Sequence, residues 1–504
     1  MAGEPTSWDA FPTMDITERY DKTLALDRTP PTDAPDWIET IDNPYLHGLF
    51  APTTVEREAD ALPVLEGAIP PELFGAYFRN GPNNRFAPKN RYHWFDGDGM
   101  VHGIWFENGQ ARYRNRWIRT EGFERETEVG DGIWPGVLGP FDFSLPIGPI
   151  KDTANTDLIV HQGRLMALWY ESGELYALDP QTLDTLDRVD FDGQLPGRVS
   201  AHSKVCPHTG DFIFFRYGDE PPYMTYGVVR PDGSVHHTDI TLYGPRRPHD
   251  IGMTPNFSVL HDFPVFFDPE VFKKTGKRIP LFHPEVPTRF GIIPRFGSDE
   301  DVQWFEFEPC YMLHVVNCWE EDGWIIQVGC RTDDPTLQPN KADGKIAAML
   351  SGLKLQANLY VWGINPTTGE KREGPMDDLN AEFPMIHPGM VGVKNRFSYH
   401  ARIPHEIPAA FHGIVKYDLE TGTPEVTDYG DGIFGSEAPF IPRPGATEED
   451  DGWLVTFVTH VDSWASQCWI YDARNLSSGP IAKVGLPGRV PAGFHATWLP
   501  GSPS

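Results

Sequence analysis

Four histidines lie in distinctive phrases of the chain and are its clearest candidates for metal chemistry. His202 lies in Ser-Ala-His-Ser-Lys-Val, His249 in Pro-His-Asp-Ile-Gly-Met-Thr-Pro, His314 in Met-Leu-His-Val-Val-Asn-Cys-Trp, and His495 in Gly-Phe-His-Ala-Thr-Trp. An imidazole inside an apolar run must find partners for both ring nitrogens, because an unpaired polar group is costly to bury. Taken alone, a histidine such as His314 is better explained by hydrogen bonds within a core, since most single histidines are not metal ligands. Taken together, four neutral imidazoles would form a nitrogen site suited to iron, copper or zinc.

The elements that carry these histidines are predicted to be strands. Residues 310–321, around His314, are apolar and β-branched, which predicts a buried strand. A strand followed by a turn rich in Asp, Asn, Gly or Thr, and then by another strand, recurs at intervals of roughly fifty residues or multiples of that. The five clearest copies begin at Leu175, Gly227, Tyr360, Gly413 and Trp469.

This repetition predicts an all-β, radial fold, a β-propeller in which each unit is one small antiparallel sheet. We expect residues 41–504 to form a single propeller domain, since a closed ring cannot be divided, and residues 1–40 to form an extended, proline-rich arm. Separations of 47, 65 and 181 residues would place the four histidines on different blades, whose innermost strands meet at the axis. Helical patterns are confined to residues 270–275 and 345–357, which are predicted to cap the ring.

The composition excludes several classes of protein. The formal net charge of −30 argues against nucleic-acid binding, which depends on Lys and Arg at phosphates. Five cysteines without a Cys-x-x-Cys pair indicate a reduced, cytoplasmic protein, and the N-terminal sequence has no secretory leader. No apolar run reaches the ~20 residues of a membrane-spanning helix. Residues 133–150 are apolar but contain four prolines and three glycines, so they are predicted to form a packed loop, an entrance or a peripheral membrane contact. We expect a monomer or a weak dimer.

Several phrases resemble those of one family of oxygenases. The four histidine phrases, in this order, together with Asn-Pro-Tyr-Leu from residue 43, Phe-Arg-Asn-Gly-Pro-Asn from residue 78 and Phe-Asp-Gly-Asp-Gly-Met from residue 95, are similar to the carotenoid cleavage oxygenase family. The resemblance covers roughly nine-tenths of the chain. It implies a seven-bladed β-propeller with a dome of helices and loops over the metal-bearing axis. It also implies a non-haem Fe(II), with O2 as co-substrate, held by His202, His249, His314 and His495.

The resemblance further implies three carboxylates behind the ligands. A metal-bound imidazole normally donates its other N–H to a carboxylate or carbonyl, which fixes its tautomer. By similarity these carboxylates are Glu382, Glu437 and Glu171, with Glu174 as the alternative to Glu171. Thr156 matches a family position near the open coordination site, where it would restrict access, although an ordinary strand threonine explains it equally well.

The resemblance favours cleavage of an apolar alkene by O2 into two carbonyl products. The leading substrate is a carotenoid or apocarotenoid, and the alternative is a stilbenoid or a phenylpropenoid of the isoeugenol type. Met100 occupies the place where hydroxystilbene cleavers carry a tyrosine, and its thioether suits a polyene better than a phenol. Two further hypotheses are alkene isomerisation with ester cleavage and no oxygen uptake, and a propeller that binds partners without catalysis.

Overall fold

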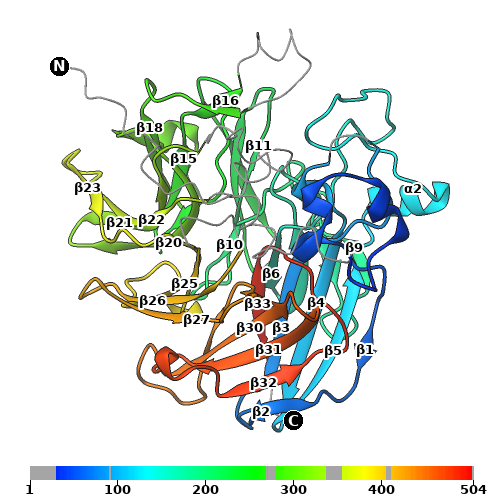
Figure 1. Cartoon of the computed structure of the whole chain (residues 1–504). Coiled ribbons are helices and arrows are strands. Elements are labelled where there is room, and N and C mark those ends of the chain that lie inside the picture. Colours follow the sequence, from blue (N-terminus) through cyan, green and yellow to red (C-terminus); the bar gives the residue numbers. More distant parts are fainter. Residues whose placement is uncertain are drawn as a thin grey trace, which may run out of the picture.

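The computed structural model describes residues 30–89, 92–267, 270, 280–335, 355–403 and 410–501. Within these residues, seven antiparallel sheets are arranged around a common axis as a seven-bladed propeller (Figure 1). The predicted all-β propeller is thus confirmed. The segments predicted to be helical, 270–275 and 345–357, lie outside the described residues apart from Glu270 and residues 355–357, and the latter three have no regular secondary structure.

We number the blades along the chain and give their strands from the axis outward. The first blade holds β33 (Ala496–Pro500), β3 (Gly75–Pro82), β4 (Gly99–Glu107), β5 (Gln110–Trp117) and β1 (Glu58–Ala59). The second holds β6 (Asp157–His161), β7 (Arg164–Leu168), β8 (Tyr176–Leu178) and β9 (Thr185–Arg188). The third holds β10 (Lys204–Val205), β11 (Phe212–Tyr217), β12 (Met224–Val229) and β13 (Val235–Ile240). The fourth holds β14 (Gly252–Met253), β15 (Phe257–Asp262), β18 (Thr288–Pro294) and β19 (Gln303–Phe307).

The remaining blades follow the same plan. The fifth holds β20 (Tyr311–Glu321), β21 (Trp324–Thr332), β22 (Asn358–Ile364) and β23 (Lys371–Pro375). The sixth holds β24 (Ala381–Ile386), β25 (Phe397–Arg402), β26 (Gly413–Asp418) and β27 (Thr423–Asp428). In the seventh, β28 (Ile433–Gly435) and β29 (Phe440–Pro442) both pair with β30 (Gly452–His460), followed by β31 (Ala465–Asp472), β32 (Ala482–Gly485) and β2 (Val64–Gly67). A separate hairpin, β16 (Val265–Phe267) and β17 (Pro280–Phe282), is inserted within the fourth blade.

The two ends of the chain close the ring. The C-terminal strand β33 pairs with β3, with Arg79 opposite Ala496, and in Figure 1 this red strand lies beside the blue strands of the same blade. The N-terminal strand β2 pairs in turn with β32 of the seventh blade. Innermost strands from distant parts of the sequence therefore reach the same axis.

Apolar side chains between successive blades form the core. One cluster, for example, joins Phe290 of the fourth blade to Trp362 of the fifth, with ring centroids 5.4 Å apart. Another joins Tyr77 of the first blade to Phe457 of the seventh, at 4.7 Å. Each blade thus buries both faces, which explains why its inner strands are almost continuously apolar.

The five predicted strand–turn–strand units all occur. They correspond to the hairpins β8–β9, β12–β13, β22–β23, β26–β27 and β31–β32, each of which joins the third strand of a blade to the fourth. The repeat is visible in the sequence because this hairpin uses the same Asp- or Asn-based turn in five blades.

One α-helix of the described residues was not predicted. Helix α2 (Glu121–Val129) begins after Thr120, whose hydroxyl accepts a hydrogen bond from the Phe123 amide, and ends at Gly130 with φ of 77°. A capping threonine and a left-handed terminal glycine are recognisable helix boundaries. The single buried aromatic of this short, acidic helix, Phe123, gave no periodic apolar pattern.

Candidate metal centre

Each of the seven blades contributes at least one site residue from its innermost strand or the residues beside that strand. In blade order these residues are His495, then Thr156 with Asp157, His202, His249, His314, Glu382 and Glu437. Because the innermost strands converge, residues at corresponding heights face one another across the axis. The four histidines accordingly lie on four different blades.

The four imidazole rings form a compact group. The centroid of the His202 ring lies 4.7 Å from His249, 4.8 Å from His314 and 4.4 Å from His495. The centroid of His314 is 5.1 Å from His249 and 4.8 Å from His495. Nitrogen atoms of His202, His249 and His314 lie within 4.8 Å of one another, as the ligands of one metal ion would. The tertiary structure therefore brings all four sequence-predicted histidines together.

Two ring nitrogens of this group have no hydrogen-bond partner in the part of the chain that the structure describes. Among the described residues, Nε2 of His202 and Nε2 of His314 are buried without a hydrogen bond. Buried polar atoms are nearly always paired, and an unpaired one requires an explanation such as a bound ion. Neutral imidazole nitrogens aimed at a common point fit a divalent transition metal.

Two carboxylates hold the imidazoles from behind. His314 donates from Nδ1 to Oε2 of Glu382 at 2.5 Å, and Nδ1 of His495 lies 3.1 Å from Oε1 of Glu437. Both carboxylates are buried, at 0% and 2% exposure. A carboxylate at Nδ1 leaves Nε2 free to bind a metal. The role of Glu382 and Glu437 as supports of metal ligands remains a prediction.

Glu171 has a different neighbour. Its Oε2 lies 3.1 Å from Nη1 of Arg247, which also pairs with Asp219 at 2.6 Å. Arg247 is two residues from His249 in the sequence. The role of Glu171 behind His249 remains a prediction. The alternative, Glu174, lies 3.6 Å from Arg198, and both side chains are more than one-third exposed.

Thr156 is built into the centre through its backbone and its hydroxyl. Its carbonyl accepts a hydrogen bond from the His495 amide at 3.2 Å. Its hydroxyl donates to Asn155 and accepts from the Tyr170 amide. Its predicted role as a restriction on access is left as a prediction.

Two residues at the centre were not recognised in the sequence. Asp157 approaches His202, with Oδ2 at 3.8 Å from Nδ1. Phe383 has a φ of 54°, and its ring centroid lies 4.8 Å from that of His495 and 4.9 Å from that of His314. Both are next to predicted residues, but a carboxylate beside Thr156 or an aromatic beside Glu382 has no distinctive spacing. Only the meeting of separate blades reveals their position.

Burial sets the protonation of the centre. It lowers the pKa of His202, His249 and His314 well below the ordinary value, which keeps these imidazoles neutral. For His495, burial also acts to lower the pKa, but the charge and hydrogen bond of Glu437 outweigh it and the pKa is raised. Burial raises the pKa of Glu382 to about 8. Three of the imidazoles are thus available as neutral ligands at neutral pH.

Comparison with known proteins assigns the chain to a family. A sequence model of the family described as "Retinal pigment epithelial membrane protein" matches residues 50–500. Carotenoid 9,10(9',10')-cleavage dioxygenase 1 of Phaseolus vulgaris is 35% identical over 496 residues, which cover 91% of this chain and 90% of that protein. The carotenoid cleavage oxygenase of Mycobacterium tuberculosis is 33% identical, over 91% of this chain and 98% of that protein. The chain belongs to the carotenoid cleavage oxygenase family.

The fold agrees with this assignment. The crystal structure of Pseudomonas brassicacearum lignostilbene dioxygenase superposes with a TM-score of 0.82 at 27% identity, covering 91% of this chain and 99% of that chain. The prediction that the chain is an alkene-cleaving oxygenase is thereby confirmed at the level of the carotenoid cleavage oxygenase family.

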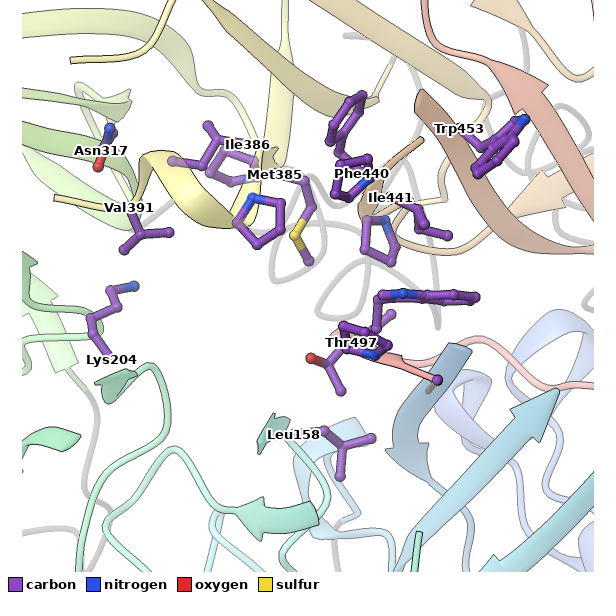
Figure 2. A pocket seen from close by; sticks show the side chains of 18 of the residues that line it. Leu158, Lys204, Asn317, Met385, Ile386, Val391, Phe440, Ile441, Trp453 and Thr497 are labelled. Atoms are coloured by element: carbon purple, nitrogen blue, oxygen red, sulfur yellow. The ribbon is translucent and has the colours of Figure 1, made fainter. Parts of the chain in front are cut away.

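An apolar cavity of about 950 Å³ lies on the propeller axis of this carotenoid cleavage oxygenase (Figure 2). It is lined by residues that follow the site residues along the innermost strands, including Asp157, Lys204, Ile251, Val315 and Ala496. Figure 2 shows Lys204, Leu158, Thr497 and Met385 around the opening, from different blades. The histidine centre therefore borders on the axial cavity.

Met100 is 0% exposed in β4 and packs against Trp117 and Phe123. Its predicted effect on the choice of substrate remains a prediction.

The loop of residues 133–150 is irregular and partly packed. The Trp134 indole is buried and donates to the carbonyl of Gly148 at 3.0 Å, whereas Phe143 is 74% exposed. None of the helices among the described residues combines the length and apolarity needed to cross a bilayer.

Proposed function

We propose that this carotenoid cleavage oxygenase is an Fe(II)-dependent dioxygenase that cleaves a conjugated C=C bond of a carotenoid or apocarotenoid into two carbonyl products. The observation that carries the proposal is the convergence of His202, His249, His314 and His495, with unpaired Nε2 atoms on two of them. Bound Fe(II) would supply the binding and activation of O2.

The protein residues would act by holding the iron ligands in fixed positions. Four imidazoles from separate blades cannot move independently, because each is fixed by a β-sheet and two of them by buried carboxylates. No side chain is needed as an acid or base at the cleaved bond, since both oxygen atoms of O2 end in the two carbonyl groups.

The surroundings of the histidines support an apolar substrate. The Phe383 ring contacts the rings of His495 and Phe411, the latter at 4.6 Å. Phe494, beside His495, contacts Phe95 at 5.1 Å. These four phenylalanines have no hydroxyl with which to anchor a phenol, and aromatic surfaces favour contact with a polyene. The 35% identity with a protein named for carotenoid cleavage points the same way.

The test of this proposal is a comparison of substrates under 18O2. Purified protein loaded with Fe(II) would be incubated with a carotenoid, an apocarotenal, a hydroxystilbene and a vinylphenol. We expect cleavage of a polyene, with one 18O atom in each fragment at short reaction times and one O2 consumed per cleavage. Cleavage of the stilbene or vinylphenol alone would establish the alternative substrate class. Conversion without oxygen uptake would instead indicate an isomerase, and protein without bound iron would contradict the metal site.

Metal binding is expected to depend on pH through His495 and Glu382. In metal-free protein both groups have a raised pKa, so at pH 6 both hold a proton. Metal binding requires neutral His495 and an ionised Glu382 that accepts from His314, so up to two protons are released. His202, His249 and His314 are already neutral and release none. Affinity should therefore rise with pH while either group still holds a proton, and the part of the rise that is due to Glu382 should end above its pKa of about 8.

Calorimetry with Co(II), which is stable to air, would measure this release in buffers that differ in ionisation enthalpy. The number of protons released should fall as the pH is raised from 6 to 9. Glu382→Gln should remove the part of the release that titrates near pH 8. A release that stays constant over this range would contradict the prediction.

A further inference from the structure

The two buried glutamates of the centre share one arrangement. Oε2 of Glu382 accepts from His314 Nδ1 and also from the backbone amide of Phe383, both at 2.5 Å. Glu437 faces Nδ1 of His495 with one oxygen and accepts a backbone amide with the other. In both pairs the carboxylate and the imidazole come from neighbouring blades, the fifth and sixth or the seventh and first.

Asp157 repeats this arrangement at His202. Its Oδ2 accepts from the His202 backbone amide at 3.2 Å and lies 3.8 Å from His202 Nδ1. Its Oδ1 accepts from the Leu158 amide at 2.7 Å. Asp157 begins the innermost strand of the second blade and His202 precedes that of the third, so again the two residues come from neighbouring blades.

The backbone of His202 explains why a carboxylate is needed there. His202 has a φ of 61°, in the left-handed region that a residue with a side chain seldom adopts without compensating contacts. The Asp157 hydrogen bond to the His202 amide secures this conformation, which directs the ring towards the axis. Phe383, with a φ of 54°, is held in the same way by Glu382.

We propose that Asp157 is the positioning residue of His202, a third carboxylate equivalent to Glu382 and Glu437, which holds the ring and places negative charge behind Nδ1. The 3.8 Å separation exceeds a hydrogen bond of about 2.7–3.2 Å, and such contacts at active sites often tighten when the site is loaded. This inference rests on the proposed iron site.

Another carboxylate near the histidine group, Asp250, already has partners of its own. Lys204, two residues after His202, is paired with Asp250 at 2.6 Å. Asp250 also accepts the amides of Ile251 and Val315. Asp250 is therefore occupied by Lys204 and two amides, whereas Asp157 lies 3.8 Å from the His202 ring nitrogen and also acts electrostatically on His495. At 9% exposure on the edge of the axial cavity, Asp157 is screened little by solvent.

Asp157→Asn keeps the volume and an amide acceptor but removes the charge. In iron-loaded protein without O2, we expect Fe(II) to be released to a chelator about 10–100-fold faster than from the wild type, the range typical for loss of a carboxylate behind a ligand. The EPR spectrum of the nitrosyl adduct should also change, because the His202 ligand is altered. Asp152→Asn is the matched control: Asp152 is a buried carboxylate of the same segment that accepts the amides of Ala154 and Glu174. It should leave both readouts unchanged.

Release at the wild-type rate from the Asn variant, or equally fast release from the Asp152 control, would overturn the proposal. Thermal unfolding of the metal-free proteins shows whether the Asn variant folds. If it does not, Asp157→Glu is used, and a nitrosyl spectrum and release rate both identical to the wild type would overturn the proposal. Wild-type protein that holds no iron would contradict the iron site itself, and is thus distinguishable from failure of this inference.

Discussion

His314→Ala is expected to abolish stoichiometric iron binding and reduce alkene cleavage to background. His314 lies at the centre of the β20 strand, contacts the rings of His202, His249 and His495, and is 4% exposed. Removing a ligand should cost more than the about 10–100-fold that follows loss of a supporting carboxylate. Iron would be quantified after anaerobic loading and gel filtration, and cleavage would be followed by loss of polyene absorbance.

A buried histidine away from the centre provides the control. His400, in β25 of the sixth blade, is 2% exposed and its Nε2 lies 2.9 Å from Ser398 Oγ. His400→Ala removes a buried imidazole of similar packing but should retain one iron per chain. An His314→Ala protein that folds and still holds one iron would contradict the four-histidine centre.

Glu382→Gln has the second largest expected effect. Glu382 is 0% exposed and accepts from both His314 and the Phe383 amide. Both donors bind Oε2, so a glutamine carbonyl placed there could accept both. Its N–H₂ group would then take the place of Oε1, which is buried without a hydrogen-bond partner among the described residues, and its two N–H donors would be left unpaired. We expect the free energy of unfolding of the metal-free protein to fall by about 1–3 kcal/mol. Iron affinity should fall by about 10–100-fold.

Urea denaturation and chelator competition would measure the two effects separately. Glu320→Gln is the control, since Glu320 lies on the same strand as His314 but accepts from Thr254 and Asn256, away from the rings. It should leave iron affinity at the wild-type value. Unchanged affinity in Glu382→Gln would show that Glu382 does not support His314 as a ligand.

The pairing of ligands with carboxylates follows from the blade geometry. Asp157, Glu382 and Glu437 each stand beside a histidine from the adjacent blade. The blades on either side of His249 carry His202 and His314, and the carboxylate predicted behind His249 is Glu171 of the second blade. A propeller thus supplies one side chain per blade at the level of the metal, and the order of blades decides which side chains become neighbours.

The sequence by itself determined the repeated hairpins and the identity of the four histidines. The hairpins could be predicted because a turn is specified by a few adjacent residues. The same Asp- or Asn-based turn joins the third strand of a blade to the fourth in five blades. His314 could be recognised as a candidate because an imidazole in an apolar strand requires a polar partner.

Only the tertiary structure revealed the neighbours of Asp157, Glu171 and Met100. Asp157 meets His202 across 45 positions of sequence, Glu171 pairs with Arg247, and Met100 is enclosed by Trp117 and Phe123. These contacts depend on how adjacent blades pack and on the left-handed backbone of His202. Neither feature produces a periodic pattern in the sequence. Local patterns specify strands and turns, whereas the neighbours of a buried charge are set by the closing of the ring.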